Sequence, residues 1–196
     1  MKSNKIRIAV FASGSGSNAE RFFEHFKHSP LAEIALVCSN RQDAYVLERA
    51  RNHRLPTYTF TNKQLQESQD VLLKLQEEKI DLIVLAGFLR LIPSYLIEAF
   101  PNSIVNIHPA LLPKWGGKGM WGIHVHEAVV KAKELQSGIT IHYVNGRYDE
   151  GDIIYQTSCA LTEHDSPAEV AAKVLRLEHE HYPKVVEQLI REKYKE

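Results

Sequence analysis

Short runs of β-branched and aliphatic residues alternate with longer amphipathic segments through the first half of the chain, and this alternation constrains the fold more than any other feature. A repeated strand, helix, strand pattern is typical of a parallel sheet with helices packed on its faces. In the clearest helical segment, 62–79, the residues Leu65, Val71, Leu72 and Leu75 recur at helical spacing. The candidate strands are 6–12, 33–38, 57–60, 81–86 and 103–107.

The last third of the chain follows a different pattern. Segments 138–144 and 152–156 are extended, and the polar loop between them is typical of an antiparallel return. The whole chain therefore predicts an α/β fold. We expect a Rossmann-like, doubly wound and mostly parallel sheet in a single domain, with helices on both faces and an antiparallel C-terminal extension.

A long helix is expected from Ser166 to the end of the chain. Ser166 is suited to the N-cap, Pro167 to the first helical position, and Glu169 to the partner position of a capping box. Pro183 lacks a backbone N–H and is expected to break or kink this helix.

Composition and charge exclude several classes of protein. The 24 basic and 24 acidic side chains cancel, so no overall field attracts nucleic acid or an anionic membrane. Cys38 and Cys159 lack metal-type spacing, which favours a reducing compartment. The apolar run 8–12 is too short for a signal peptide, and no stretch reaches the roughly 18 apolar residues of a membrane span. We therefore expect a soluble, cytoplasmic protein.

Three loops are expected to meet at one edge of the sheet. Residues 13–18 follow the first strand, 87–92 follow the fourth, and 106–109 end the fifth. Because parallel strands share the edge at which they end, and ligands bind where the strand order reverses, these loops should line one crevice.

The first of these loops is a candidate phosphate cradle. Two glycines and hydroxyl groups precede a predicted helix, whose N-terminal N–H groups attract anions, although a plain tight turn is the alternative. The spacing Gly14, Gly16, Ala19 also fits a loose dinucleotide fingerprint. The second strand ends in Cys38-Ser39-Asn40-Arg41 rather than in an acidic residue, which counts against NAD and less against NADP.

Four motifs in the chain resemble those of the phosphoribosylglycinamide formyltransferase family, folate-dependent enzymes of purine biosynthesis. They are SGSGSN at 13–18, LAGFLR at 85–90, NIHPALLPK at 106–114 and YDEG at 148–151. The resemblance runs from about residue 6 to 183 and implies transfer of a formyl group from 10-formyltetrahydrofolate to the primary amine of glycinamide ribonucleotide. It also implies a division of the single domain, 1–196, into a nucleotide- and phosphate-binding half, 1–105, and a catalytic and folate-binding half, 106–196.

Formyl transfer to an amine passes through a tetrahedral oxyanion, so the site needs hydrogen-bond donors and a group that manages a proton. Asn106 can donate an amide N–H, and His108 an imidazolium N–H that a nearby carboxylate would favour. The resemblance assigns that carboxylate to Asp149, which would also hold a water that relays the proton. Without the resemblance, each of these residues could equally be a turn former or a solvated side chain.

The resemblance further implies two binding regions. The ribonucleotide phosphate and ribose would contact Gly14, Ser15, Gly16, Ser17, Asn18 and Glu178. The folate would contact Phe88, Leu89, Arg90, Leu91, Ile92 and Asn106. For Glu178 the alternative is a solvated helix charge, and for the apolar residues it is plain core.

The chain departs from the family pattern at residues 115–122, where a glycine-rich insertion precedes His124 and His126. We expect a mobile flap near the folate entrance. The segment 60–69 lacks an arginine that relatives carry, so no site residue is assigned there. The histidine pairs 124/126 and 179/181 suit no catalytic zinc motif, and the expected metal is none. His142 is expected to support the site.

Several other functions could use the same residues. A hydrolase that releases formate from the same folate would use the same asparagine, histidine and aspartate, but it lacks a phosphate loop and usually carries an N-terminal regulatory domain. An enzyme that formylates initiator tRNA would need a basic C-terminal domain. A nicotinamide-dinucleotide protein and a non-catalytic nucleotide-binding module are further alternatives. A monomer or a homodimer is expected.

Overall fold

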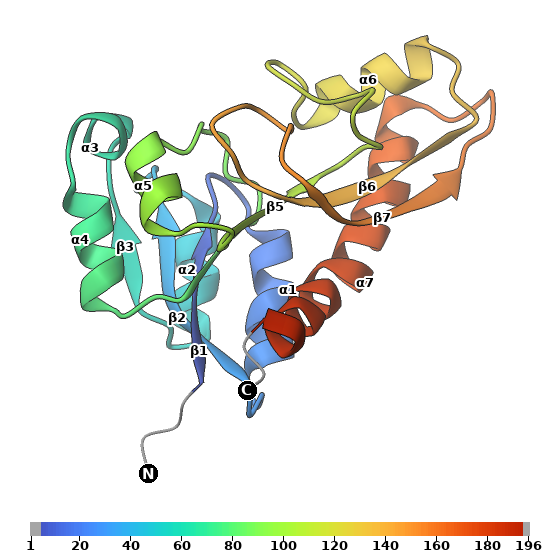
Figure 1. Cartoon of the computed structure of the whole chain (residues 1–196). Helices are drawn as coiled ribbons and strands as arrows, with labels where there is room; N and C mark the ends of the chain where they lie inside the picture. Colours follow the sequence, from blue (N-terminus) through green and yellow to red (C-terminus); the bar gives the residue numbers. More distant parts are fainter. Residues whose placement is uncertain (1–4, 194–196) are drawn as a thin grey trace.

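A seven-stranded sheet in the order β3-β2-β1-β4-β5-β6-β7 organises the chain in this computed structural model, which describes residues 5–193 (Figure 1). Its first five strands in chain order are parallel, and β6 and β7 are antiparallel additions at one edge. The strands are β1 Ile6–Phe11, β2 Ala32–Ser39, β3 Thr57–Thr59, β4 Leu82–Leu85, β5 Ile104–His108, β6 Gln136–Tyr143 and β7 Ile153–Ala160.

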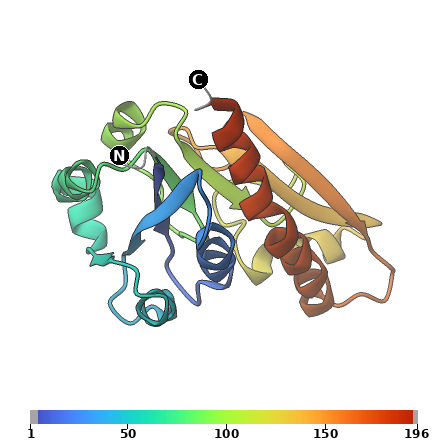
Figure 2. The same cartoon turned by 90° about the horizontal axis from the view of Figure 1, so that it is seen from below.

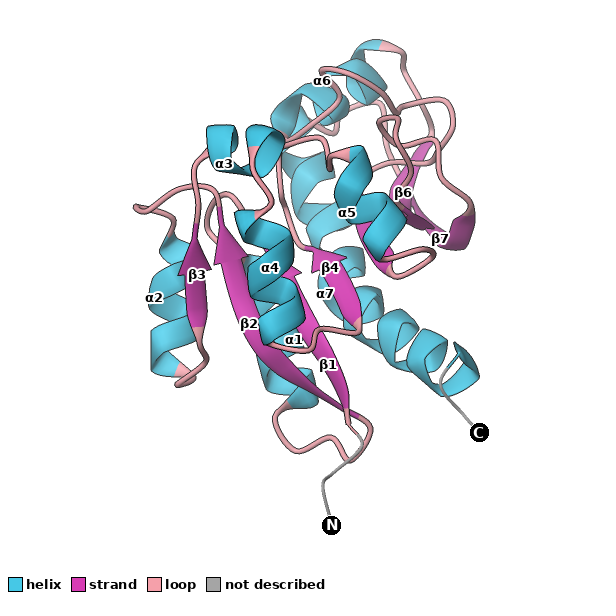
Figure 3. Cartoon of the chain, turned by 60° about the vertical axis from the view of Figure 1, so that its left-hand side comes forward, coloured by secondary structure: helices cyan, strands magenta, loops and turns pink. Residues whose placement is uncertain are grey.

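Helices cover both faces of the sheet, as Figures 2 and 3 show. Alternate residues of β1 belong to two different buried clusters: Ile8 and Val10 pack with α1 and α7, whereas Ala9 and Phe11 pack with α4 and α5. The period of two along a strand thus fills both cores at once. The helices are α1 Ser17–Phe26, α2 Tyr45–Asn52, α3 Asn62–Glu67, α4 Asp70–Glu77, α5 Ser94–Ala99, α6 Ile123–Lys131 and α7 Pro167–Lys193.

The predicted fold class is confirmed. Every predicted parallel strand is present, with ends that differ by at most two residues, and the antiparallel return from β6 to β7 is also present. The order reverses between β1 and β4, which lie side by side although β2 and β3 come between them in the chain. The loops that follow β1, β4 and β5 therefore begin at one edge of the sheet.

The prediction of one helix over 62–79 was wrong, because two helices occupy this segment. Ser68 takes an extended conformation between α3 and α4, with φ −130° and ψ 168°. Its hydroxyl donates to the Gln64 carbonyl and accepts from the Asp70 N–H. One serine thus satisfies the end of one helix and the beginning of the next, which apolar spacing alone does not reveal.

Of the break or kink predicted at Pro183, the break does not occur, because α7 continues through this residue. Pro183 is buried, and so are Tyr182 and Val186 on the neighbouring turns. Tertiary packing on both sides holds the helix together across the missing N–H. The predicted capping box is confirmed, since Glu169 accepts from the Ser166 N–H and the Ser166 hydroxyl accepts from the Glu169 N–H. The predicted helical end at 194–196 lies outside the described residues.

Tyr182 links α7 to the sheet directly beneath the edge where the loops meet. Its ring is fully buried and packs edge-on against Phe22 of α1, with ring centroids 4.9 Å apart. Its hydroxyl lies 3.0 Å from the Leu85 carbonyl and 3.1 Å from the Val105 carbonyl, one on β4 and the other on β5. The hydroxyl therefore holds these two neighbouring strands at a fixed separation.

We expect Tyr182→Phe to lower the free energy of unfolding by roughly 1–3 kcal/mol, because a buried hydrogen-bond donor is lost while the ring packing stays. Urea denaturation measures this change. Tyr45→Phe is the matched control, since Tyr45 is 56 % exposed and should leave the unfolding free energy nearly unchanged. Equal stability of Tyr182→Phe and the wild type would contradict a structural role for this hydroxyl.

Candidate active site

A cavity of about 650 Å³ lies at the edge of the sheet where β4 and β5 end. Its wall combines the loop after β4, the end of β5, the glycine-rich insertion and the loop before β7. The lining residues are 87–92, 106–109, 117–122, 147–149, Asn18, Leu85, His142, Val144 and Glu178. Two of the three loops expected to meet therefore line it fully, whereas the first loop contributes only Asn18.

The glycine-rich loop before α1 lies beside this cavity and is held by α2. Gly16 has φ +71°, and a Cβ there would lie 2.6 Å from the Val46 side chain, so only glycine fits. Arg49 donates to the Ser15 carbonyl at 2.8 Å and pairs with Glu20 at 3.0 Å. Within the described residues 5–193, no side chain caps the first turn of α1, which leaves its N–H groups open to an anion.

Asn18 and Glu178 meet at one end of the cavity although 160 residues separate them in the sequence. The Asn18 amide donates to the Glu178 carboxylate at 2.5 Å, and both residues are only 8 % exposed. Burial raises the pKa of Glu178, and the Asn18 hydrogen bond only partly opposes that rise. The Asn18 carbonyl oxygen is buried without a partner among the described residues. Glu178 is thus a buried residue of the cavity wall rather than a solvated helix charge.

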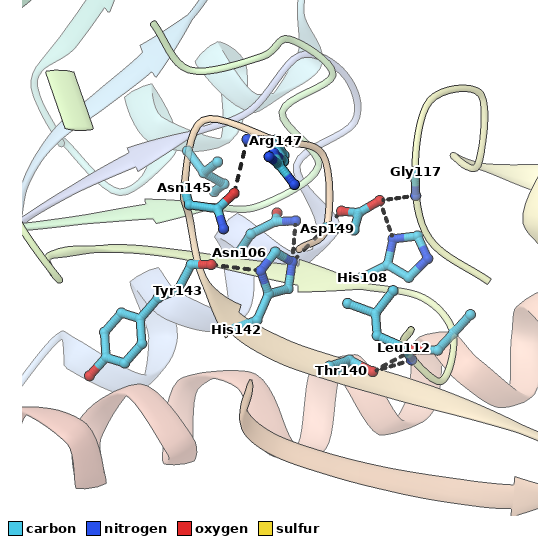
Figure 4. Close-up of polar contacts among 12 residues, drawn as sticks. Asn106, His108, Leu112, Gly117, Thr140, His142, Tyr143, Asn145, Arg147 and Asp149 are labelled. Carbon is cyan, nitrogen blue, oxygen red and sulfur yellow. Dashed lines mark hydrogen bonds and ion pairs between the residues drawn. The ribbon is translucent and has the colours of Figure 1, made fainter. Parts of the chain in front are cut away.

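Asn106 is oriented by His142 from the neighbouring strand (Figure 4). The His142 Nδ1 lies 2.8 Å from the Tyr143 carbonyl, and its Nε2 lies 3.2 Å from the Asn106 amide nitrogen and 3.7 Å from the Asp149 carboxylate. One N–H of Asn106 is used in this way, and the other is available to the cavity that Asn106 lines. His142 was absent from the predicted catalytic and binding set, and it matches the expectation of a supporting role.

His108 is buried at 3 % exposure between two acceptors. Its Nε2–H donates to the Trp115 carbonyl at 2.7 Å, and its Nδ1 lies 3.4 Å from the Asp149 carboxylate. Burial lowers the pKa of His108, and this outweighs the nearby Asp149 charge and the Trp115 carbonyl, which raise it. We expected the carboxylate to favour the imidazolium. The Asp149 charge does act in that direction, but in the free protein desolvation outweighs it and lowers the pKa of His108.

Asp149 lies opposite His108 in a loop with unusual backbone geometry. Its φ is +56°, and its carboxylate accepts the Gly117 N–H at 3.0 Å. Burial by itself raises the pKa of Asp149, but His142, His108 and the Gly117 N–H together outweigh it and lower the pKa. Asp149 is therefore ionised at neutral pH and available as a charged partner for the imidazole.

The glycine-rich insertion joins the site more closely than an entrance flap would. Trp115 packs against the main core and presents its carbonyl to His108, and Gly117 donates to Asp149. A Cβ at Gly116 would lie 2.5 Å from a Leu112 methyl group and 3.0 Å from the Asp149 Cβ, so the chain passes close to both side chains here and a larger residue would have to displace them. Sequence reasoning missed these backbone contacts because they involve no characteristic side chain.

Two of the predicted folate-contacting residues are also core residues. Phe88 packs edge-on against Phe11 at 5.4 Å between ring centroids and is 8 % exposed, and Ile92 is 3 % exposed in the same cluster. Their burial fixes the loop, while Leu89 and Arg90 are exposed at the cavity. The Ser13 hydroxyl accepts the Leu89 N–H at 3.0 Å, which links this loop to the glycine-rich loop.

Among residues 5–193, no three histidine, cysteine, aspartate or glutamate side chains are grouped as a metal site would require. His124 contacts Glu127 and the Trp121 ring, and His181 stacks on Tyr155. In the same range, no helix is long and apolar enough to cross a membrane.

The sheet is doubly wound, and the cavity at its edge gathers an amide, an imidazole and a carboxylate. This arrangement is typical of α/β enzymes that bind small molecules and catalyse their reactions. The chain belongs to the formyl transferase family, whose sequence model matches residues 6–186.

Curated relatives share this sequence over most of the chain. Phosphoribosylglycinamide formyltransferase of Bacillus subtilis is 36 % identical over 189 residues, which cover 94 % of each protein. The chloroplastic phosphoribosylglycinamide formyltransferase of Arabidopsis thaliana is 38 % identical over 96 % of this chain. The chain spans 67 % of that plant protein and 62 % of its Vigna unguiculata counterpart.

Solved structures share the fold. Phosphoribosylglycinamide formyltransferase from Anaplasma phagocytophilum superposes with a TM-score of 0.88 at 32 % identity, covering 97 % of this chain and 89 % of that one. Glycinamide ribonucleotide transformylase 1 from Geobacillus kaustophilus gives a TM-score of 0.87 at 34 % identity, covering 95 % and 100 %. These proteins therefore share the fold of the present chain over nearly its whole length.

Proposed function

We propose that this chain transfers the formyl group of 10-formyltetrahydrofolate to the primary amine of glycinamide ribonucleotide, producing formylglycinamide ribonucleotide and tetrahydrofolate in purine biosynthesis. One observation carries the proposal: in a member of the formyl transferase family, Asn106, His108 and Asp149 line one cavity that also reaches the buried pair Asn18 and Glu178. The first three residues suit an acyl-type reaction. The last two suit a hydroxylated, phosphorylated acceptor.

The reaction begins when the amine nitrogen attacks the formyl carbon, which forms a new C–N bond and an oxyanion. The free N–H of Asn106 donates to this oxyanion, and the His108 N–H that faces the Trp115 carbonyl at 2.7 Å in the free protein exchanges that neutral acceptor for the charged one. The negative charge also opposes the burial that lowers the pKa of His108, so the imidazolium becomes more favourable as the intermediate forms.

Collapse of the intermediate breaks the bond from the formyl carbon to N10 of the folate, and the proton lost by the amine reaches that nitrogen. Asp149 is ionised and faces the cavity, so it holds a water that relays this proton and stabilises the imidazolium. Catalysis here consists of donors and charges already in place, because His108 and Asp149 are each held by a backbone group of the insertion.

The two substrates approach from different sides of the cavity. The ribonucleotide phosphate binds at Gly14, Ser15, Gly16 and Ser17, where the uncapped N–H groups of α1 attract it, and its ribose reaches Asn18 and Glu178. The folate enters between residues 87–92 and the loop that ends at Asp149, with the pterin against Leu89, Arg90 and Leu91. Phe88 and Ile92 hold this wall from behind.

The test is a dual-substrate assay that follows the absorbance of the folate released from a 10-formyl folate analogue. We expect release that depends on added glycinamide ribonucleotide. Formate release without any requirement for the amine would refute the transferase and favour the hydrolase, which uses water in place of the amine. Inactivity with both would refute a catalytic role and favour the nucleotide-binding alternatives.

We expect Glu178→Ala to raise the KM for glycinamide ribonucleotide about tenfold or more and to change kcat little, because a hydrogen bond between a carboxylate and a sugar hydroxyl is lost outside the reacting centre. The KM for the folate should stay constant. Glu180→Gln is the matched control, since Glu180 lies on the same helix with its side chain exposed. A rise confined to the folate KM would contradict the assignment.

The remaining partners follow from charge and composition. The proposed substrates are small anions, the net charge is zero, and binding of nucleic acid or membranes is not expected. We propose a cytoplasmic location, a monomer or homodimer, no metal, and a phosphate-binding half at 1–105 with the catalytic half at 106–196.

A further inference from the structure

Side chains of β6 and β7 form hydrogen bonds with the turn that follows His108, residues 110–112. Thr140 lies directly opposite His108 in the antiparallel pairing of β5 with β6, and Gln156 lies opposite Thr140 on β7. Neither residue lines the cavity, and Thr140 is fully buried. Any influence that these two residues have on the reaction must therefore act through the segment they contact.

The hydroxyl of Thr140 uses its full hydrogen-bonding capacity on this segment. It donates to the Ala110 carbonyl at 2.7 Å and accepts the Leu112 N–H at 3.1 Å. It also accepts from the Gln156 amide at 2.8 Å, and the same amide nitrogen donates to the Leu112 carbonyl at 3.1 Å. Three of these hydrogen bonds reach the backbone of residues 110–112, which begin two residues after His108, and the fourth joins the two side chains. Figure 4 shows Thr140 beside Leu112.

The sheet also leaves room for this turn. A Cβ at Gly138 would lie 2.8 Å from a Leu111 methyl group, so the Leu111 side chain packs where β6 has no side chain. Ala110 and Leu112 are buried on either side of it. β6 therefore contacts the turn at two successive positions of one face. Leu111 packs over Gly138, and the Thr140 hydroxyl forms hydrogen bonds with the turn backbone.

We propose that Thr140 and Gln156 are positioning residues that hold the backbone of 110–112 and thereby keep the His108 imidazole against Asp149. Because the turn and the insertion that contacts both catalytic side chains are continuous in the chain, a shift at Leu112 moves the Trp115 carbonyl and the Gly117 N–H as well. Catalytic groups displaced by about 1 Å lose rate steeply while substrate binding persists. The kinetic part of this inference rests on the proposed function.

The decisive variant is Thr140→Val, which keeps the β-branched shape and removes the hydroxyl. We expect kcat to fall on the order of 10- to 100-fold with little change in the KM for glycinamide ribonucleotide. Thr140→Ser should restore most of kcat, because serine returns the donor and both acceptor positions. Thr157→Val is the matched control: Thr157 is the next residue on β7, faces the opposite side of the strand, and should leave kcat unchanged.

The second readout needs no turnover. The imidazole C–H resonance of His108, followed by NMR against pH, should shift in Thr140→Val, and its pKa should rise toward the ordinary histidine value because a loosened turn relieves the burial that lowers it. Thr157→Val should leave the resonance in place. If the wild type shows no formyl transfer, the proposed function is refuted. The comparison of the His108 resonance between the wild type and Thr140→Val still tests whether Thr140 positions His108.

Unchanged kcat and an unchanged His108 resonance in folded Thr140→Val would overturn the inference, and so would a folded Thr140→Ser that restores neither. If Thr140→Val does not fold, Gln156→Met tests the positioning role instead, because it removes the Gln156 amide and leaves the Thr140 hydroxyl in place. We expect a smaller loss of kcat and a smaller shift of the resonance in that variant. A wild-type rate and resonance in Gln156→Met would then refute a role for this pair.

Discussion

Replacement of His108 by alanine abolishes nearly all turnover and leaves ribonucleotide binding in place. The expected loss in kcat is about 1000-fold, in the range found when a positioned proton-transfer group or an oxyanion donor is removed. The ring contacts the Trp115 carbonyl and Asp149, whereas the proposed ribonucleotide contacts lie at α1 and α7, so the two effects separate. The dual-substrate assay measures kcat, and calorimetric titration of glycinamide ribonucleotide into folate-free protein measures binding.

A matched control distinguishes this loss from general damage. His164 is an exposed histidine in the loop before α7, and His164→Ala should retain full activity. Thermal denaturation establishes that the His108 variant is folded, since alanine leaves a small cavity at a buried position. Lost ribonucleotide binding with turnover intact would contradict the assigned role, and so would a folded His108→Ala enzyme with wild-type kcat.

Replacement of Asp149 by asparagine keeps the shape of the side chain and removes its charge. We expect kcat to fall about 100-fold or more, because the imidazolium loses its counter-charge and the relayed proton loses its acceptor. The pKa of His108 should fall further below the ordinary value in this variant, since the Asp149 charge raises that pKa while burial and His142 lower it. The imidazole resonance of His108, titrated by NMR, measures this shift.

Glu150→Gln provides the comparison for the Asp149 variant. Glu150 is the next residue in the chain, is exposed, and pairs with Arg147 at 3.1 Å on the surface. Its replacement should change neither kcat nor the His108 pKa, because solvent screens that charge. A His108 pKa that stays constant or rises in Asp149→Asn would rule out the proposed electrostatic coupling between the two side chains.

The parallel core and the location of the site could be predicted from local patterns. β-branched runs at regular intervals imply parallel strands, and parallel strands end at one edge, so the loop after β4 and the end of β5 had to meet. The motif around Asn106 and His108 then indicated the chemistry. The break at Ser68 and the continuity of α7 through Pro183 were not predictable, because the first depends on a side-chain hydrogen bond and the second on packing against α1 and the sheet.

By itself, the sequence determined the fold class and the sheet edge at which Asn106 and His108 stand, since these follow from periodicity and from which groups stand at strand ends, whereas formyl transfer was implied by the family resemblance. Only the tertiary structure decided how those groups behave. It brought Glu178 to Asn18, placed His142 behind Asn106, and buried His108 so deeply that its pKa falls beside a carboxylate. The physical reason is that desolvation and long-range contacts depend on everything packed around a side chain, and no short stretch of sequence contains that information.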